Sequence, residues 1–521
     1  MIVAVGAVLR TVAIGREALW SDEALTLVLA HWPVGEMIMQ PADQTPFLHY
    51  TLHKLLFTAA DSAATVRTLS LAAGLAAIPL IYAAGRLCFG RNAGLAAAAL
   101  LAVWAPHIDY SQEDRAYALL FLLTLASATS LLAWFAEATR EESRPRRRYL
   151  ALVGFALTTA LSFYAHVTSI FWIAVALQIF ISLTLRTPAQ RYRAEAAAAL
   201  ALMALLAAPG LLRLVRALST PDTFHWLSQA SPAGFVSTAA GIFLPFGTGA
   251  AEPVLQALVA AAIAFLLLSH RTELKRLVGA NPAAPAVILG LLALPLIVWL
   301  AGFVLRPLFM PRTALYGASG SILLIAGALQ LLPRLRNAAA AAVAALALSQ
   351  PLLAGTVRPK EDWRGAYAAL AARVQPGDLV VACPAWKYPA LRHAAAHPLP
   401  APLAVTFSEP LLLEGRFGGR ADWDRAFFEA VTAPSTRYLI YGRRFGPYPT
   451  ARLPLRDGAR VWLVASECSA EEMRSVRIWS TGSAARVVWR SPARGDHAGI
   501  ELVGFKLARA ATLLVRVPPR R

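Results

Sequence analysis

The stretch Gly15-Arg16-Glu17-Ala18-Leu19-Trp20-Ser21-Asp22-Glu23-Ala24-Leu25 places two adjacent carboxylates directly after the first apolar run of the chain. An ionised side chain at the centre of a bilayer costs about 2.5–3.5 kcal/mol on insertion scales. If the flanking runs cross a membrane, Asp22 and Glu23 must lie at its surface or line a polar cavity. A simpler interpretation is that Ser21 caps a helix and the two acids face the positive end of its dipole. The rest of the chain has to decide between the two.

The composition is that of an integral membrane protein. The 521 residues are 57% hydrophobic and only 15% charged, with a mean hydropathy of +0.54, whereas soluble domains carry about 25% charged residues. Although the formal net charge is +19, no basic patch interleaved with aromatic residues indicates nucleic-acid binding. We therefore expect membrane lipids, and no nucleic acid, around these cations.

About eleven apolar runs are expected to cross the membrane. They occupy residues 1–15, 64–84, 92–108, 116–136, 149–165, 167–185, 195–216, 252–268, 283–305, 313–332 and 338–356. The first run is short and carries Arg10, and it resembles a membrane helix more than a cleavable signal peptide. Two helical pieces within 23–57 are expected to lie along the membrane surface. Arg67, and Lys54 unless it contacts a ligand, are expected to reach toward lipid headgroups.

The distribution of Lys and Arg between alternate loops fixes the orientation, because cytoplasmic loops carry the excess of these residues. With the N-terminus inside, the cytoplasmic loops hold Arg86, Arg91, Arg140, Arg144, Arg146, Arg147, Arg148, Arg186, Arg191, Arg193, Arg271, Lys275, Arg276, Arg334 and Arg336. The opposite loops hold Arg16, Lys54, Arg115, Arg306 and Arg312, with Arg67, Arg213 and Arg216 near the boundary. This asymmetry places Asp22, Glu23 and everything after residue 357 outside the cell membrane.

The chain is expected to divide where the apolar runs end. Residues 1–357 are predicted to form a transmembrane domain, and residues 358–521 a small external α/β domain. The second prediction rests on a helical pattern over 361–373 and on short apolar strands at 379–382, 438–441, 461–464 and 499–503. If this domain is exported, a disulfide between Cys383 and Cys468 could form.

The external loops combine carboxylates with cations. The candidate site residues among them are Asp22, Glu23, Lys54, Glu113, Asp114, Arg115 and Arg312. Transfer of a sugar from a lipid phosphate needs a carboxylate that takes the acceptor proton and cations that hold the phosphate as it gains charge. The polyprenyl tail of such a donor stays in the bilayer, which explains a site at the membrane surface. We expect Lys54 and Arg312 to contact the phosphate.

Several of these stretches resemble motifs of the polyprenyl-phosphate-sugar-dependent glycosyltransferases of the protein-mannosyltransferase type (family 39), with their bacterial aminoarabinose-transferase and Rgt-like relatives. They are Leu19-Trp20-Ser21-Asp22-Glu23-Ala24, Thr45-Pro46-Phe47-Leu48-His49-Tyr50, Tyr110-Ser111-Gln112-Glu113-Asp114-Arg115-Ala116-Tyr117, Phe309-Met310-Pro311-Arg312 and Glu361-Asp362-Trp363-Arg364. The chain departs from the family in its short first span and in Thr313, where relatives often have tyrosine.

The resemblance implies a GT-C fold and an inverting transfer, with Asp22 as the catalytic carboxylate and Glu23 beside it. It implies that Glu113, Asp114 and Arg115 shape the donor or acceptor site. The donor would be a polyprenyl-phosphate-linked hexose or pentose, and the acceptor an envelope glycan, a protein, or a lipid such as lipopolysaccharide. No tightly bound cofactor is expected and no metal ligand set stands out, although family members differ over a divalent metal. The expected location is the inner (plasma) membrane of a bacterium, with the site and the C-terminal domain on the periplasmic side.

Other interpretations stay open. A multi-span transporter or flippase for lipid-linked envelope precursors would also carry polar groups, usually near the midplane on broken helices. A non-catalytic scaffold has no evident need for acids and cations on one face, and an oligosaccharide polymerase or ligase would use a diphosphate carrier. Individual residues also have simpler roles: Glu23 could merely complement a helix dipole, and Arg115 could pair with Asp114. Structural or interfacial roles are expected for His49, His53, His166 and His225.

Overall fold

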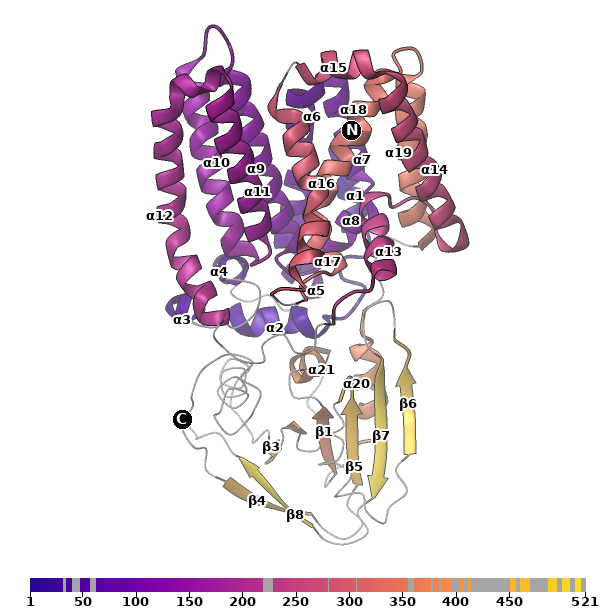
Figure 1. Ribbon diagram of the computed structural model, residues 1–521. Helices are drawn as coiled ribbons and strands as arrows, with labels where there is room; N and C mark the ends of the chain where they lie inside the picture. Colours follow the sequence, from indigo (N-terminus) through magenta and orange to yellow (C-terminus); the bar gives the residue numbers. More distant parts are fainter. Residues whose placement is uncertain are drawn as a thin grey trace.

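The chain folds into a helical bundle with a mixed β-sheet beneath one of its ends (Figure 1). This computed structural model describes residues 1–30, 34–39, 47–56, 62–218, 228–279, 281–305, 307–354, 360–375, 378–383, 387–394, 403–405, 411–413, 450–455, 460–468, 486–493, 499–506 and 511–516. The expected class, a helical polytopic membrane protein followed by a small α/β region, is confirmed.

A helix forms at each of the expected spans. These helices are α1 (Ile2–Thr11), α6 (Thr68–Phe89), α7 (Arg91–Ala102) with α8 (Ala105–Ser111), α9 (Tyr117–Ala138), α10 (Pro145–Ala165), α11 (Ser169–Arg186), α12 (Arg193–Leu218), α14 (Glu252–Ser269), α16 (Ala283–Ala301), α17 (Pro311–Ala314) with α18 (Ala318–Ala328), and α19 (Arg336–Ala354). Among the described residues, eight helices are long and apolar enough to cross a membrane, or nine if the bent pair α7–α8 is one span. This is fewer than the eleven expected, because α1 has only 10 residues and α19 also falls outside that set.

The bend between α7 and α8 measures 60° and brings the following loop to the sheet-facing end of the bundle. Helix α6 packs against α8 closely at Gly74, where an added Cβ would lie 2.1 Å from Oγ of Ser111. At the other end of α6, Gly90 has φ +90° and ends the helix, so that α7 begins at the next residue. These two glycines allow three helical pieces to fold back on one another within a short length of chain.

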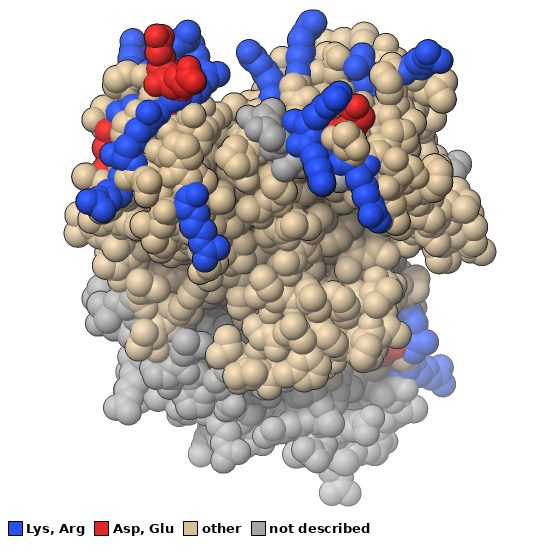
Figure 2. Space-filling view, turned by 45° about the horizontal axis from the view of Figure 1, so that its top comes forward, with Lys and Arg blue, Asp and Glu red and all other residues tan. Residues whose placement is uncertain are grey.

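Positive charge gathers at the end of the bundle farthest from the sheet (Figure 2). The exposed cations of the loops predicted to be cytoplasmic are Arg86, Arg91, Arg140, Arg144, Arg146, Arg147, Arg186, Arg191, Arg193, Arg271, Lys275, Arg276 and Arg334. Short helix α15 (Arg271–Gly279) lies across this end. The charge asymmetry read from the sequence therefore corresponds to two opposite ends of the folded bundle.

Helices α2 (Ser21–Ala30), α3 (Val34–Met39) and α4 (Leu48–Leu56) lie at the opposite end, between the bundle and the sheet (Figure 1). This confirms the expected helical pieces between the first two spans. Shorter pieces at this end are α5 (Ala63–Val66) and α13 (Pro232–Phe243). Ala24 and Leu29 of α2 share a hydrophobic core with Trp363, Leu370 and Val380 of the sheet region. The segment between α1 and α6 and the C-terminal region thus bury apolar surface against each other.

The described residues of the C-terminal region form a sheet of eight strands in the order β4-β8-β3-β2-β1-β5-β7-β6. They are β1 (Leu379–Cys383), β2 (Leu403–Val405), β3 (Leu411–Leu413), β4 (Thr450–Leu455), β5 (Arg460–Ala465), β6 (Arg486–Ser491), β7 (Ile500–Lys506) and β8 (Ala511–Arg516). Central β1 runs parallel to both β2 and β5, and β7 pairs antiparallel with β5. Helices α20 (Trp363–Ala371) and α21 (Tyr388–Ala394) lie between this sheet and the bundle (Figure 1). The strands expected at 379–382, 461–464 and 499–503 are confirmed, and the one at 438–441 lies outside the described residues.

Candidate active site

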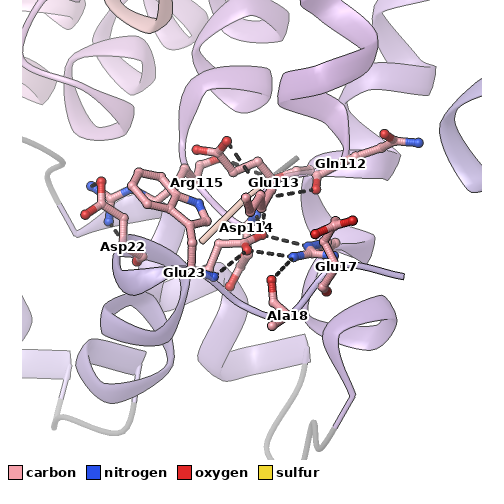
Figure 3. A network of polar contacts seen from close by, with 12 residues as sticks. Glu17, Ala18, Asp22, Glu23, Gln112, Glu113, Asp114 and Arg115 are labelled. Carbon is pink, nitrogen blue, oxygen red and sulfur yellow. Dashed lines mark hydrogen bonds and ion pairs between the residues drawn. The ribbon is translucent and has the colours of Figure 1, made fainter. Parts of the chain in front are cut away.

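The predicted site residues converge from parts of the chain that are distant in sequence (Figure 3). Asp22 and Glu23 lie in the first turn of α2, and Glu113, Asp114 and Arg115 occupy the loop between α8 and α9. Arg312 lies in α17, at the start of a span. Figure 3 shows Glu23 and Asp114 near the centre of the network, with Asp22 on one side and Glu17 on the other.

Asp22 is faced by two arginines, and we call these three residues the Asp22 cluster. Its Oδ2 lies 3.4 Å from the guanidinium of Arg312 and 4.0 Å from that of Arg115. The Asp22 side chain is 20% exposed, whereas those of Arg115 and Arg312 are 4% and 15% exposed. The carboxylate is thus partly open at its surface, and the cluster carries one more positive than negative charge. Such a group could exchange a proton while the surplus cation binds an anion.

Arg115 is held by several acceptors on neighbouring helices. Its guanidinium donates to the backbone oxygen of Asp22 at 3.4 Å, to the hydroxyl of Tyr50 at 3.3 Å and to Thr26 at 3.5 Å. Arg115 therefore turns toward α2 and α4, whereas the sequence left open a pairing with Asp114. Arg312 lies within about 6 Å of the Trp20 and Tyr117 rings, consistent with cation–π attraction.

Glu23 is completely buried and its two oxygens are occupied. Arg67 donates to both of them at 2.7 Å, Lys360 lies at 3.0 Å, and the backbone N–H of Asp114 donates at 2.9 Å. Burial alone would raise the pKa of Glu23, but Arg67 and Lys360 together hold it well below its usual range. Glu23 also accepts from the backbone N–H of Trp20 at 3.3 Å. It therefore satisfies an amide next to the start of α2 and also forms buried ion pairs.

Arg67 was expected to reach toward lipid headgroups, and that expectation is wrong. Its side chain is 1% exposed and points into the protein. Besides Glu23 it binds the backbone oxygens of Ile14, Glu17 and Ala18 at 2.6, 3.2 and 3.0 Å. A sequence window of apolar residues cannot reveal this, because the carboxylate partner is 44 positions away.

Asp114 lies between two buried histidines of α4. Its Oδ1 is 3.0 Å from Nε2 of His49, and its Oδ2 is 3.3 Å from Nε2 of His53. Burial raises the pKa of Asp114 to about 7, and burial, together with the charge of Arg115, lowers that of His49 to about 3. The two histidines thus fasten α4 to the loop that carries Arg115, in keeping with the structural role expected for them.

Glu113 and Lys54 occupy different surroundings. The Glu113 carboxylate is 7% exposed and lies 3.9 Å from the ammonium of Lys360. Burial raises its pKa above the usual range, because the charge of Lys360 offsets the loss of water only in part. Lys54 lies on α4, half-buried, one helical turn beyond Tyr50. Arg306 and His225 lie outside the described residues.

Sequence reasoning missed Lys360 as a site residue. It lies just before Glu361-Asp362-Trp363-Arg364, a stretch noted only for its resemblance to the family. The signal that could have pointed to it is the adjacent pair of opposite charges at the junction of the two parts of the chain. Among the residues that the structure describes, no group of three His, Cys, Asp or Glu side chains is arranged to hold a metal ion.

The fold has a solved counterpart. ArnT from Cupriavidus metallidurans bound to undecaprenyl phosphate is similar to this chain with a TM-score of 0.53 and 13% sequence identity, over 96% of this chain and 97% of ArnT. The Archaeoglobus fulgidus oligosaccharyltransferase in complex with Zn and sulfate gives a TM-score of 0.47 and 15% identity, over 76% of this chain and 61% of that one. No family model and no curated protein matches the sequence.

The likeness to ArnT extends over nearly the full length of both chains, so it includes the bundle and the C-terminal region. Together with the apolar helices, it shows a multi-pass membrane protein with a GT-C fold. Within that class, the fold of this chain is the one seen in ArnT. The fold expected from the sequence is therefore confirmed.

Proposed function

We propose that this chain is an inverting glycosyltransferase that moves a sugar from a polyprenyl-phosphate donor to an acceptor of the cell envelope. The observation that carries the proposal is the Asp22 cluster, in which one partly exposed carboxylate is faced by two arginines at the sheet-facing end of a membrane bundle. A fold shared with ArnT along nearly the whole chain supports it.

In the proposed reaction, an acceptor hydroxyl attacks the anomeric carbon of the donor sugar. Asp22 takes the hydroxyl proton as the new carbon–oxygen bond forms. The bond between the anomeric carbon and the phosphate oxygen breaks on the opposite face, and its electron pair leaves with the polyprenyl phosphate. Attack opposite the leaving group inverts the anomeric centre. Because phosphate is a competent leaving group, the chain needs no separate acid to protonate it.

Arg115 and Arg312 are the proposed phosphate ligands. Each is held by contacts on neighbouring helices, so little reorganisation is needed when the phosphate gains charge. Glu113 and Asp114 are proposed to shape the surrounding donor or acceptor site, and Lys54 stays a further candidate for a phosphate contact, as predicted from the sequence. For Glu23 the proposal is a positioning role, because Arg67, Lys360 and the Asp114 amide already occupy its oxygens.

The lipid donor is supported by the chemistry of the structural counterpart. ArnT was solved with undecaprenyl phosphate, a polyprenyl phosphate. In this chain, Arg312 lies at the end of a span that runs from Pro311 to Leu331. A phosphate bound there would sit at the membrane surface while its polyprenyl tail remained among the helices or in lipid. The transferred sugar is proposed to be a hexose or pentose, and the acceptor a glycan, a protein, or a lipid such as lipopolysaccharide.

The proposed location is the inner membrane of a bacterium, with the Asp22 cluster facing the periplasm. The exposed cations at the far end of the bundle favour that end as cytoplasmic. Cys383 and Cys468 form a disulfide in the sheet region, with Cα atoms 5.6 Å apart, and disulfides persist in oxidising compartments. We therefore propose residues 1–357 as the transmembrane catalytic domain and 358–521 as a periplasmic domain.

The test is glycan mass spectrometry of the envelope from cells that lack the protein. The cells are complemented with wild type, with Asp22→Asn or with Glu17→Gln, all at matched membrane levels. Glu17 is a suitable control because it is a nearby carboxylate that lies on the other side of the network (Figure 3). We expect one sugar to disappear in the deletion and to return with wild type and Glu17→Gln but not with Asp22→Asn.

Full restoration by Asp22→Asn would remove Asp22 from the reaction. An envelope with unchanged glycans in the deletion strain would overturn the transferase proposal itself, and would favour a transporter or scaffold. No second function is proposed, since the cluster lies at one end of the bundle rather than at its midplane, where transporter sites usually lie.

A further inference from the structure

Two adjacent charged residues reach from the sheet region into the polar network. Lys360 and Glu361 come between the last bundle helix, α19, and the first helix of the sheet region, α20. Both are 3% exposed, although an adjacent acid and base outside an element usually lie in water. Burial of both charges is costly unless each has partners, so their contacts define what they do.

Glu361 caps the start of α2. Its Oε2 accepts from the backbone N–H of Ser21 at 3.2 Å and from the Ser21 hydroxyl at 2.6 Å, across 340 positions of sequence. The first amides of a helix lack partners within it and attract negative charge. From the sequence Ser21 itself was a candidate cap, but in the structure α2 begins at Ser21 and its hydroxyl donates to the carboxylate. The residue that follows this capped position is Asp22.

Lys360 joins α2 to the loop that carries Arg115. Its ammonium lies 3.0 Å from Glu23 and 3.9 Å from Glu113, and it donates to the backbone oxygen of Gln112 at 3.5 Å. One cation thus spans the residue after Asp22 and two residues of the loop. Lys360, which is not part of the Asp22 cluster, thus links the helix that carries Asp22 to the loop that carries Arg115.

The sheet region anchors this pair of residues. Glu361 also accepts from the indole N–H of Trp363 at 2.6 Å and pairs with Lys387. Lys387 in turn lies 2.9 Å from Glu467, which precedes the disulfide-bonded Cys468. A path of direct contacts therefore runs from the disulfide at the end of the sheet to the first turn of α2.

We infer that Lys360 and Glu361 are positioning residues, through which the C-terminal region fixes the first turn of α2 and so the carboxylate of Asp22 relative to its two arginines. The catalytic consequence rests on the proposed function, whereas the effect on α2 does not. Displacement of a reacting group by about 1 Å can cost about 100-fold in rate. The bundle alone would therefore contain the reactive residues, but it would not fix the position of Asp22 relative to Arg115 and Arg312.

The experiment compares full-length wild type with Glu361→Ala, Glu361→Gln and Glu501→Ala in lipid nanodiscs. Glu501 is the control, because it forms an exposed ion pair with Arg490 in the same sheet. Glutamine keeps an oxygen that can accept from Ser21, whereas alanine removes it. Hydrogen–deuterium exchange of peptides covering residues 16–30 reports the first turn of α2, binding of undecaprenyl phosphate reports the arginines, and sugar transfer in matched membranes reports turnover.

We expect Glu361→Ala to speed exchange in the first turn of α2 by about 10-fold or more, the scale of a lost hydrogen bond to a charged group. Sugar transfer should fall by about 10-fold or more, while affinity for undecaprenyl phosphate changes less than about threefold. Glu361→Gln should regain most of both losses, and Glu501→Ala should match wild type. Lys360→Met should reproduce the loss of transfer, with Lys360→Arg restoring part of it.

Normal exchange and normal transfer in a folded Glu361→Ala protein would overturn the inference. Faster exchange without any loss of transfer would overturn its catalytic half. If Glu361→Ala does not fold, Glu361→Gln decides. Exchange over residues 16–30 that is as fast in Glu361→Gln as in the denatured protein would show that Glu361 has a purely structural role, and would overturn the inference. If wild type transfers no sugar but Glu361→Ala still loosens α2, the positioning stands and the proposed function fails.

Discussion

The carboxylate of Asp22 lies 3.4 Å from the guanidinium of Arg312, although 290 positions separate them. Asp22 lies in the first turn of α2, and Arg312 lies at the start of a span near the end of the bundle. Arg115 completes the arrangement at 4.0 Å from the same oxygen. These three side chains together carry one more positive than negative charge.

Arg312→Ala should lower sugar transfer by about 100- to 1000-fold, the usual effect of removing one group that stabilises developing negative charge. Arg312→Lys should retain part of the rate, because it keeps the charge but not the planar fork of donors. The measurement is the rate of product formation in membranes with equal amounts of protein. Arg276→Ala, at the opposite end of the bundle, is the control. Wild-type transfer by Arg312→Ala would remove this residue from the phosphate site.

Glu23→Gln should destabilise the fold by about 3–5 kcal/mol, because it leaves Arg67 and Lys360 buried without their shared counter-charge. Thermal unfolding in detergent should show a lower midpoint than wild type. Glu17→Gln, six positions before it, should leave the midpoint unchanged. An unfolding temperature equal to that of wild type would mean that the buried network adds little to stability.

The contribution of Glu23 to the stability of the fold should depend on pH, and the direction follows from its pKa. The folded pKa of Glu23 is held below its unfolded value of about 4.3. Its contribution to stability is therefore complete above about pH 4.3 and is lost as the pH falls from there toward the folded pKa. The difference in unfolding temperature between wild type and Glu23→Gln should be largest near pH 7 and should shrink as the pH is lowered below 4. A difference that grows in acid would contradict this assignment.

Arg10→Met should loosen the bend between α7 and α8. The Arg10 side chain is fully buried and donates to the backbone oxygens of Ala102 and Leu101 at 2.8 and 2.9 Å, and it contacts Nδ1 of His107 at 2.8 Å. Both oxygens belong to the last turn of α7. Leu101 also accepts from the backbone N–H of Trp104 at 3.4 Å, so the substitution chiefly leaves the Ala102 oxygen unsatisfied, at a cost of about 1–3 kcal/mol. We expect a lower unfolding temperature and faster proteolysis of the loop after α8. The exposed Arg16→Met is the matched control, and equal stability of the two variants would refute the prediction.

Thiol labelling should distinguish the three cysteines. Cys88 is free and buried, and Cys383 and Cys468 are disulfide-bonded. The folded protein should therefore resist a maleimide reagent, the denatured protein should take up one label, and the denatured and reduced protein three. Mass spectrometry of the intact chain counts the labels. Three labels without reductant would show that the disulfide is absent and would weaken the periplasmic assignment.

Hydropathy and charge alone predict the helices of the bundle and the two ends between which they run. Each apolar run forms a helix because the bilayer offers backbone groups no other partners, and alternating arginine-rich loops record the orientation. Among the described residues, eight helices, or nine with the bent pair α7–α8, are long and apolar enough to cross a membrane, and α1, which ends at Thr11, is too short to be one of them. Strands β1, β5 and β7 were also predicted, since buried strands form short apolar runs.

Partner choice within the site was not predictable in the same way. Arg67 and Lys54 look alike in sequence, as cations beside apolar runs, yet Arg67 is buried on Glu23 and Lys54 is half-buried on α4. Neither Lys360 nor the cap that Glu361 supplies to α2 was foreseen, because Glu361 lies 340 positions from Ser21 and Lys360 lies 248 positions from Gln112. Short-range patterns contain no information about such contacts.

The sequence by itself determined that the chain is a helical membrane protein, and it predicted the sidedness of the loops and Asp22 as the carboxylate to test. These depend on local chemistry: the cost of placing charge in lipid, the period of a helix and the order of short motifs. The tertiary structure alone decided that Asp22 faces Arg115 and Arg312, that Glu23 is enclosed by cations, and that the C-terminal region holds the start of α2. Electrostatic contacts depend on distances of a few ångströms, and packing sets those distances between residues that the chain keeps far apart.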